Sequence, residues 1–419
     1  MSHATPYADG ANAPATGESL DRRPMSKSSK SVKNAAAPAK VLLINMPWTD
    51  VTEPSLGLGI LKSILTASNI ECRVLEAQVY LLKWLQPPTY KNFSKRWVVN
   101  DWLFTRELLP EAYPESLDMG MLDEALSDDT FVRKTCVSND ELREKALRIR
   151  REVVPVYLDY LMGLVDFSEY ALVGFTCLSD QTFAALALAN RIRQKYPDIL
   201  LAFGGYSLTP PTGPHLQRIF ETMDVVAYGD GEVVIGPLYE AAMGIRSLDS
   251  VPNISYRTES GELAFTETVQ CNLDDSPAPD YDEYFATWRF MKEHEQVSTK
   301  IQDIPFESSR GCWWGQKSHC TFCGIDKETL RYRVKKPDVA NAQLDQLHEK
   351  YGITRFRASD YIFPYDYHGE FLDRCKKRPV PYQLHYEMKS GLTEKKALAL
   401  KEAGLFFAQL GVESFWAFQ

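Results

Sequence analysis

Three closely spaced cysteines have the clearest chemical meaning in this sequence. Cys312, Cys320 and Cys323 lie in the stretch GCWWGQKSHCTFC and follow the pattern C-x7-C-x2-C. Thiolates are soft ligands that bind iron–sulfur clusters, zinc or Cu(I). Three thiolates can hold three irons of a 4Fe-4S cluster and leave the fourth iron open to another ligand. The spacing therefore predicts a metal centre, with an iron–sulfur cluster as the favoured interpretation.

A structural zinc site is the alternative interpretation of the same cysteines. Zinc takes four ligands in a closed tetrahedral shell in such sites, and His319 could supply the fourth. Because His319 is adjacent to Cys320, ligation of one ion by both is awkward, and the sequence has no second CxxC pair. The other cysteines show no ligand spacing, and we expect structural roles for them: Cys72, Cys136, Cys177, Cys271 and Cys375.

The cysteines follow the first strand of a predicted series of alternating strands and helices. In βα barrels the active site lies at the carboxyl ends of the strands, which is where this loop begins. Four short runs predict the strands: Ile304–Ser308, Thr354–Ala358, Tyr382–Glu387 and Phe406–Leu410. Four parallel strands do not close a barrel, so we expect a partial (β/α) barrel whose last strand is an open edge.

An earlier series of strands and helices predicts a second α/β unit. Apolar runs predict its strands: Lys40–Met46, Cys72–Ala77, Ala171–Thr176, Ile199–Phe203 and Val225–Tyr228. Alternating strands and helices indicate a parallel, doubly wound (Rossmann-like) sheet. Ligands of such sheets bind beyond the carboxyl ends of the strands, and the glycine-rich stretches of this region lie there.

These patterns divide the chain into four parts and one insertion. A stretch rich in Trp, Tyr, Leu and charged residues, about residues 79–168, predicts a helical insertion in the first series. The expected parts are a disordered tail (1–39), the doubly wound domain (40–250), a hairpin and linker (251–300) and the beginning of the barrel (301–419).

Composition narrows the classes of function. The net charge is −9, which argues against a broad basic surface for nucleic acid. The sequence contains neither a run of 18 apolar residues nor the apolar core of a signal peptide. We therefore expect a cytoplasmic protein that does not interact with a membrane and whose cysteines are not a disulfide framework.

The passage ESSRGCWWGQKSHCTFCG, from Glu307 to Gly324, resembles the first loop of radical SAM enzymes. The longer spacing, the Trp-Trp-Gly after the first cysteine and the His before the second resemble one branch. That branch comprises cobalamin-binding radical SAM proteins that mature ribosomally made peptides. The segments YEMKSGLT and QLGVES are similar to later motifs of the same branch. The resemblance implies a cobalamin-binding domain followed by a radical SAM barrel, with a 4Fe-4S cluster, S-adenosyl-L-methionine (SAM) and cobalamin as cofactors.

The resemblance also implies residues that would contact SAM. Phe322 would flank the adenine, and the methionyl and ribose groups would meet residues beyond the strand ends. The implied SAM residues are Phe322, Gly324, Glu387, Lys389 and Glu413. Ordinary polarity at strand ends is the alternative explanation for Glu387 and Lys389, and a solvated loop charge is the alternative for Glu413.

The first unit departs from a common cobalamin motif. Many cobalamin domains place a cobalt-binding His in D-x-H-x-x-G after the first strand, whereas this strand runs into Asn45-Met46-Pro47-Trp48. The resemblance therefore implies cobalamin without a protein histidine ligand. Its expected contacts are Ser55, Leu56, Gly57, Thr176, Ser179, Gln181, Gly204, Gly205, Tyr228, Gly229, Gly231 and Glu232. Alternatively, the glycines serve only the turns of the doubly wound fold.

The function implied by the resemblance is radical modification of a peptide. A 5′-deoxyadenosyl radical would abstract hydrogen from an unactivated carbon, and C-methylation is the favoured outcome, with electrons from an external donor. Two alternatives stay open: a truncated relative that binds cofactors or a partner without turnover, and a zinc-stabilised nucleotide-binding module. Since an open barrel exposes apolar surface, we expect this chain alone to be poorly soluble and inactive.

Overall fold

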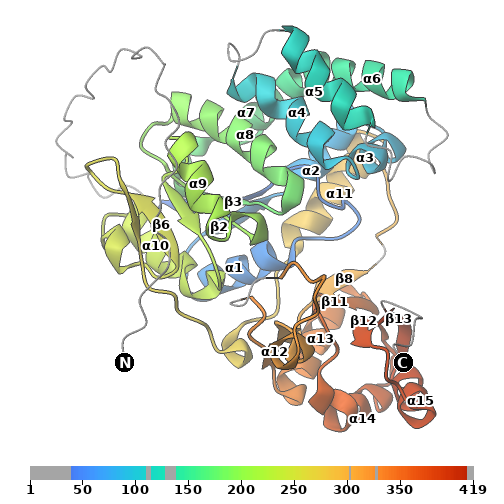
Figure 1. Ribbon diagram of the computed structural model, residues 1–419. Helices are drawn as coiled ribbons and strands as arrows, with labels where there is room; N and C mark the ends of the chain where they lie inside the picture. The colour runs from blue at the N-terminus through green and yellow to red at the C-terminus, as the bar shows by residue number, and fades with distance from the viewer. Residues whose placement is uncertain (1–38, 110–114, 128–137, 302, 326–328, 413–419) are drawn as a thin grey trace. The chain divides into compact units, whose positions relative to one another are not determined.

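The computed structural model describes residues 39–109, 115–127, 138–301, 303–325 and 329–412, so the predicted tail lies almost wholly outside the described residues (Figure 1). Within the described residues, no helix has both the length and the apolar character needed to cross a membrane.

Seven strands form the first sheet, in the order β2-β1-β3-β4-β5-β6-β7. The parallel strands are β2 (Cys72–Leu75), β1 (Lys40–Asn45), β3 (Tyr170–Thr176), β4 (Leu200–Gly204) and β5 (Val225–Ala227). These strands lie within one or two residues of the predicted ones at most of their ends. The order 2-1-3-4-5 is that of flavodoxin-like doubly wound sheets, whose ligands bind at the carboxyl edge.

Strand β1 shows why its sequence is almost continuously apolar. Leu42 and Ile44 pack in one core cluster with side chains of α8 (Thr182–Lys195), whereas Val41 and Leu43 pack in another with side chains of α1 (Leu56–Ala67) and α10 (Ile235–Ala242). Helices therefore cover both faces of the sheet, and the strand buries the side chains that point to either face.

The predicted insertion between β2 and β3 is helical. Its helices are α2 (Ala77–Tyr80), α3 (Pro87–Phe93), α4 (Trp97–Leu108), α5 (Glu115–Ser127), α6 (Asn139–Arg148) and α7 (Val154–Leu164). They group beside α8 (Figure 1). Trp102, Leu103 and Tyr157 join the same core cluster as the α8 face of the sheet, so the insertion extends the first unit instead of forming a separate core.

The segment predicted as hairpin and linker contains more regular structure than expected. Strands β6 (Ile254–Arg257) and β7 (Leu263–Phe265) form the hairpin, which extends the first sheet in antiparallel direction beside β5. Helix α11 (Asp282–His294) was not predicted. It begins after the proline-rich breaks with acidic residues in its first turn, and buries Tyr284, Trp288 and Met291 against the first unit.

The second sheet consists of four parallel strands in the order β8-β11-β12-β13. Their bounds are β8 (Ile304–Phe306), β11 (Arg355–Ala358), β12 (Gln383–Lys389) and β13 (Leu405–Gly411). Helices α13 (Pro337–Tyr351), α14 (Glu370–Lys376) and α15 (Glu394–Glu402) alternate with them. Helix α13 ends at Gly352 in left-handed conformation, and the Thr393 hydroxyl caps α15 through the amide of Lys396.

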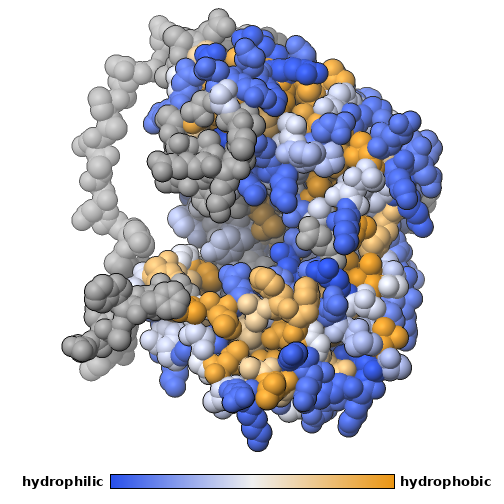
Figure 2. Space-filling view, turned by 90° about the vertical axis from the view of Figure 1, so that its right-hand side faces the viewer, coloured by the Kyte–Doolittle hydropathy of each residue, from blue (hydrophilic) through white to orange (hydrophobic). Residues whose placement is uncertain are grey.

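The last strand of this sheet lies open on one side. Among the described residues β13 pairs only with β12, and Phe406, Phe407 and Leu410 are 44%, 50% and 43% exposed. Hydrophobic surface gathers on the lower part of the face seen in Figure 2. The described strands therefore form an arc with a free edge, which is the arrangement expected of part of a βα barrel.

Candidate functional site

The cysteine loop emerges from a short ladder that the sequence analysis missed. Strand β9 (Ser309–Arg310) pairs antiparallel with β10 (Arg333–Val334), and Arg310 lies opposite Arg333. Gly311 follows with φ of +82°, and a Cβ there would lie 2.3 Å from the carbonyl oxygen of Arg331. Only glycine fits this turn. Two-residue strands carry no recognisable pattern, which explains why the ladder was not predicted.

The first cysteine lies at the start of a helical turn. Cys312 precedes α12 (Trp313–Lys317), and its Sγ accepts a hydrogen bond from the amide of Gly315 at 3.2 Å. The Trp313 indole donates to the carbonyl of Phe363 at 3.1 Å, which ties the loop to the segment after β11. The loop is therefore held at the carboxyl end of the second sheet.

The three thiols are partly buried. Among the described residues, their sulfur atoms do not form a group within 4.8 Å. Two thiolates on one zinc ion, each at about 2.3 Å, lie no more than about 4.6 Å apart. In a 4Fe-4S cluster each thiolate binds a different iron, so wider spacing is required.

The predicted SAM residues lie on both sides of this loop. Phe322 and Gly324 lie on the loop itself. Phe322 is 65% exposed, and Gly324 is also exposed. Lys389 ends β12, and its ammonium group lies over the Trp314 ring. Burial raises the pKa of Glu387, on the same edge of β12. The structure thus brings Lys389 to the cysteine loop, while Glu413 lies outside the described residues.

A cavity of about 300 Å³, here called the sheet cavity, opens at the carboxyl edge of the first sheet. Leu43, Phe203 and Leu238 contribute to its mainly apolar wall. Most of the predicted cobalamin contacts line it: Gly57, Thr176, Gly204, Gly205, Tyr228, Gly229, Gly231 and Glu232. The strand-end glycines, which sequence reasoning singled out, therefore do gather around one hollow.

The glycines of this cavity differ in what the fold requires of them. A Cβ on Gly205, at φ of +116°, would lie 2.5 Å from the carbonyl oxygen of Cys177, so the turn itself needs glycine. A Cβ on Gly57 would meet no described atom within 4 Å. The alternative that the glycines serve only the turns of the fold therefore explains Gly205 but not Gly57.

The remaining predicted cobalamin residues lie elsewhere. The Ser55 hydroxyl caps α1 by accepting from the amide of Leu58 at 3.4 Å, and Leu56 is half-buried in the first turn. Gln181 is buried, where its amide group donates to the Asn45 side chain at 2.9 Å and accepts from the Leu178 amide at 3.0 Å. These contacts give Ser55 and Gln181 structural roles. The side chain of Ser179 lies outside the described residues.

A second cavity of about 450 Å³, here called the loop cavity, adjoins the first. Ser309 of β9, Gly311 and Tyr361 (after β11) line it on one side, and Thr268 and Gln270 line it from the segment after β7. The two cavities share five lining residues: Gly205, Tyr228, Gly229, Asp230 and Arg310. Because Gly311 directly precedes Cys312, the loop cavity reaches the base of the cysteine loop.

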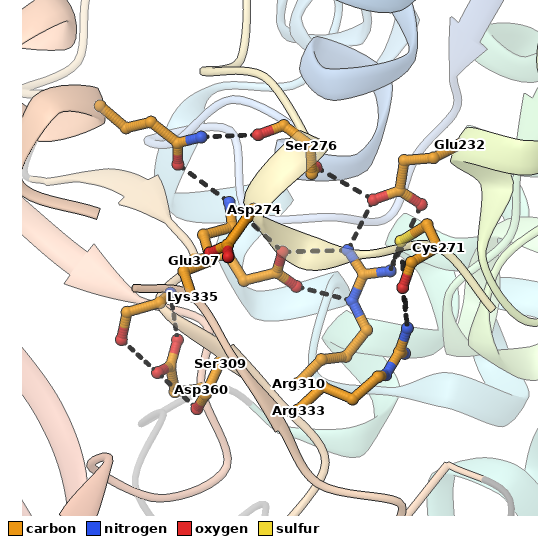
Figure 3. A network of polar contacts seen from close by, with 12 residues as sticks. Glu232, Cys271, Asp274, Ser276, Glu307, Ser309, Arg310, Arg333, Lys335 and Asp360 are labelled. Atoms are coloured by element: carbon orange, nitrogen blue, oxygen red, sulfur yellow. Dashed lines mark hydrogen bonds and ion pairs between the residues drawn. The ribbon is translucent and has the colours of Figure 1, made fainter. Parts of the chain in front are cut away.

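An ion-pair network that the sequence did not reveal forms the shared wall (Figure 3). Arg310 contacts Glu307, Asp230 and Glu232, and Arg333 also contacts Asp230. Burial alone would raise the pKa of Asp230, but hydrogen bonds from Arg333 and Arg310 outweigh it and hold that pKa well below the usual range. Nothing in the spacing of these residues along the chain could have indicated the contacts.

A buried carboxyl group lies behind the cysteine loop. Asp360 accepts hydrogen bonds from the Ser308 amide at 2.9 Å and from the Ser309 hydroxyl at 2.7 Å. Burial raises its pKa to about 6. These hydrogen bonds fix the segment that connects β8 with β9.

Solved structures with a similar fold are cobalamin-dependent radical enzymes. OxsB with aqua-cobalamin and S-adenosylmethionine bound has a TM-score of 0.55 and 16% identity over 90% of this chain and 44% of that chain. TsrM, a radical S-adenosylmethionine methyltransferase from Kitasatospora setae with cobalamin and a [4Fe-4S] cluster bound, has a TM-score of 0.54 and 15% identity over 89% and 61%.

The chain spans less than half the length of OxsB. No protein-family model matches the sequence, and the curated proteins give no match. At such low identity the likeness concerns the backbone. This chain therefore has the α/β fold, with a mostly parallel sheet, of the cobalamin-dependent radical SAM enzymes OxsB and TsrM.

Proposed function

We propose that this chain is a cobalamin-dependent radical SAM enzyme that modifies a peptide by C-methylation. The observation that carries the proposal is that the cysteine loop and the carboxyl edge of the first sheet meet at two adjoining cavities. In the similar structures, OxsB binds aqua-cobalamin and S-adenosylmethionine, and TsrM binds cobalamin and a [4Fe-4S] cluster. We extend the same set to this chain.

The thiols of the cysteine loop fit a cluster. Cys312, Cys320 and Cys323 offer three soft, partly buried ligands after the end of β9. Lys389 and Glu387, on the neighbouring strand end, would hold the carboxylate and hydroxyl groups of SAM. Phe322 is exposed and free to close over an aromatic base.

The corrinoid is assigned to the two cavities together. Each has the volume of a small-molecule site, and cobalamin, which is larger than most such ligands, would need both. The described lining residues of both cavities include no histidine, in agreement with the proposal that no protein histidine binds cobalt. Gly57, where a Cβ would meet no described atom within 4 Å, leaves room for close approach of the ligand.

Chemistry and positioning divide between cofactors and protein. When bound, the cluster with SAM supplies radical chemistry and cobalamin supplies methyl-group transfer. The chain itself contributes the walls that exclude water and the loop that holds the three thiols. A peptide would enter the loop cavity past Tyr206 and Tyr361, whose rings are 44% and 38% exposed. We also propose a cytoplasmic location and an external electron donor.

Anaerobic reconstitution with iron and sulfide tests the cluster. We expect about four irons and four sulfides per chain with a broad visible absorbance. Changing Cys312, Cys320 and Cys323 together to Ala should abolish the uptake, whereas Cys72→Ala, a partly buried cysteine on β2, should leave it unchanged. One zinc per chain without iron would instead support the structural zinc module.

A further inference from the structure

The base of the cysteine loop carries two arginines that face the first sheet together. Arg310 and Arg333 are cross-strand partners of the β9–β10 ladder, on either side of the loop. The loop that contains the three cysteines therefore begins at one strand of this ladder and returns to the other. Any restraint on the two arginines therefore restrains both ends of the loop.

Both arginines bind the same turn after β5. The Arg310 guanidinium donates to Asp230 Oδ1 at 2.7 Å and to Glu232 Oε1 at 2.8 Å. Arg333 Nη2 donates to Asp230 Oδ1 at 3.0 Å. Glu307 Oε1 accepts a hydrogen bond from Arg310 Nε at 2.8 Å, which orients the guanidinium toward the turn after β5 (Figure 3).

The charges of this network compensate one another. Asp230, Glu232 and Glu307 are each at most 10% exposed, and Arg310, Arg333 and Lys335 face them. Asp230 and Glu232 also lie near Cys271 with the spacing of metal ligands, but both carboxylates are already bound by arginine. The network therefore holds neither a spare charge for an anion nor free carboxylates for a cation.

The turn that the arginines bind also lines the sheet cavity. Gly229, Asp230, Gly231 and Glu232 belong to its wall, and Gly229 has φ of +68°. A ligand in that cavity would press on this turn directly. The turn is thus in contact with a ligand site on one side and with the base of the cysteine loop on the other.

We propose that Arg310 and Arg333 are positioning residues that couple occupancy of the sheet cavity to the order of the cysteine loop. A ligand that immobilises the turn at Asp230 and Glu232 would, through the two arginines, immobilise both ends of the loop. The coupling rests on the proposed function, because it assumes cobalamin in the sheet cavity.

Hydrogen exchange of the full chain tests the coupling, first without any cofactor. The Cys312 amide donates to Leu330 and the Lys335 amide to Ser308, so both report on the base of the loop. Asp230→Asn combined with Glu232→Gln should speed exchange at these amides by about tenfold or more, although neither substitution lies on the loop. Arg246→Ala, which breaks the exposed ion pair with Glu240, is the control and should leave them unchanged.

The second arm adds aqua-cobalamin. In the natural chain we expect slower exchange at residues 229–232 and at residues 311–325. In Arg310→Ala combined with Arg333→Ala, cobalamin should still slow exchange at 229–232 but no longer at 311–325. If this variant does not fold, Arg310→Lys, which keeps the charge but not the paired hydrogen bonds, should reduce the effect on the loop.

The outcomes separate the two proposals. Absence of cobalamin binding by the natural chain contradicts the proposed function, while the cofactor-free arm still tests the tie between the turn and the loop. Unchanged exchange at Cys312 and Lys335 in the carboxylate variant overturns the coupling. Equal protection of the loop by cobalamin with and without the arginines overturns it as well.

Discussion

Gly57 shows how one missing side chain can define a binding site. It lines the sheet cavity from the first turn of α1, and a Cβ there would meet no described atom within 4 Å. Gly57→Phe should therefore fold normally but fill the cavity, and we expect cobalamin to bind roughly tenfold more weakly or worse. Equilibrium titration followed by visible absorbance measures the change.

Gly236 provides the matched control. It lies on α10, is not among the described lining residues, and also leaves a Cβ free of described atoms within 4 Å. Gly236→Phe should bind cobalamin like the natural chain. Equal weakening by both substitutions would remove the sheet cavity from the corrinoid site.

Asp360 gives stability a defined pH dependence. Its pKa is about 6 in the folded chain because of burial, against 3.8 for the free group. The folded chain then binds more protons than the unfolded chain between these values, so the free energy of unfolding should fall as pH rises from about 4 to about 6. Asp360→Asn should remove this share, roughly 3 kcal/mol at most.

Urea unfolding at several pH values measures this share. Asp198 is an exposed aspartate outside the network, and Asp198→Asn should keep the full pH dependence. The assignment to Asp360 is wrong if its variant and the control show the same fall in stability between about pH 4 and 6.

Residue types allowed the sequence to predict some site members and not others. The cysteines can be recognised by their spacing, and the strand-end glycines by their position after apolar runs. Arg310, Arg333 and Asp230 look like ordinary surface charges, since their partners lie about 80 or 100 residues away. Ser55 and Gln181 were expected at the cavity, but hydrogen bonds within the first unit occupy them.

Among the elements, the ladder at the base of the cysteine loop depends on one turn. A Cβ on Gly311 would overlap backbone atoms of Arg331, and the residue has φ of +82°. We expect Gly311→Ala to lower the free energy of unfolding by about 1–3 kcal/mol and to reduce iron uptake.

Gly391→Ala controls for the loss of glycine flexibility, because a Cβ there would meet no described atom within 4 Å. It should change stability by less than about 1 kcal/mol. Denaturant unfolding and iron content of the reconstituted protein provide the two measurements. A fully loaded and equally stable Gly311→Ala variant would contradict the role given to this turn.

Elements with a strong periodic signal were predictable, and short or isolated ones were not. The strands of both sheets came from apolar runs because helices cover them on one or both faces. Helix α11 was not predicted because it directly follows a proline-rich segment, which is typical of a linker. The β9–β10 ladder contains two residues in each strand, too few for any alternation to be visible.

At the scale of the whole molecule, the free edge of the second sheet should govern behaviour in solution. Phe406, Phe407 and Leu410 are exposed on β13, and this strand has an unpaired side among the described residues. We expect concentration-dependent association of the 419-residue chain, measurable by sedimentation velocity. Phe406→Lys combined with Leu410→Lys should shift the chain toward monomer.

Ile245, 73% exposed near the end of α10, is the control position. Ile245→Lys adds a charge far along the sequence from β13 and should leave the association unchanged. A natural chain that is monomeric at all concentrations would contradict this prediction.

The relation between the two sheets was beyond reach of the sequence. It depends on contacts between distant residues, such as the Lys62 ammonium with Asp280 at 3.0 Å and the Tyr281 hydroxyl with the Pro305 carbonyl at 2.8 Å. Each pair consists of common residue types without special spacing. The fold of each unit follows local patterns, whereas their joining follows specific side chains.

The position of the two arginines along the chain has a consequence for synthesis on the ribosome. Chains are synthesised from the amino end at about 5–20 residues per second, so Asp230 and Glu232 are made well before Arg310 and Arg333. The first sheet must then form with these carboxylates still hydrated. Ribosome-stalled chains ending after Phe265 should already resist protease across β1 to β5. The base of the cysteine loop can bind Asp230 and Glu232 only after Arg310 and Arg333 have been made.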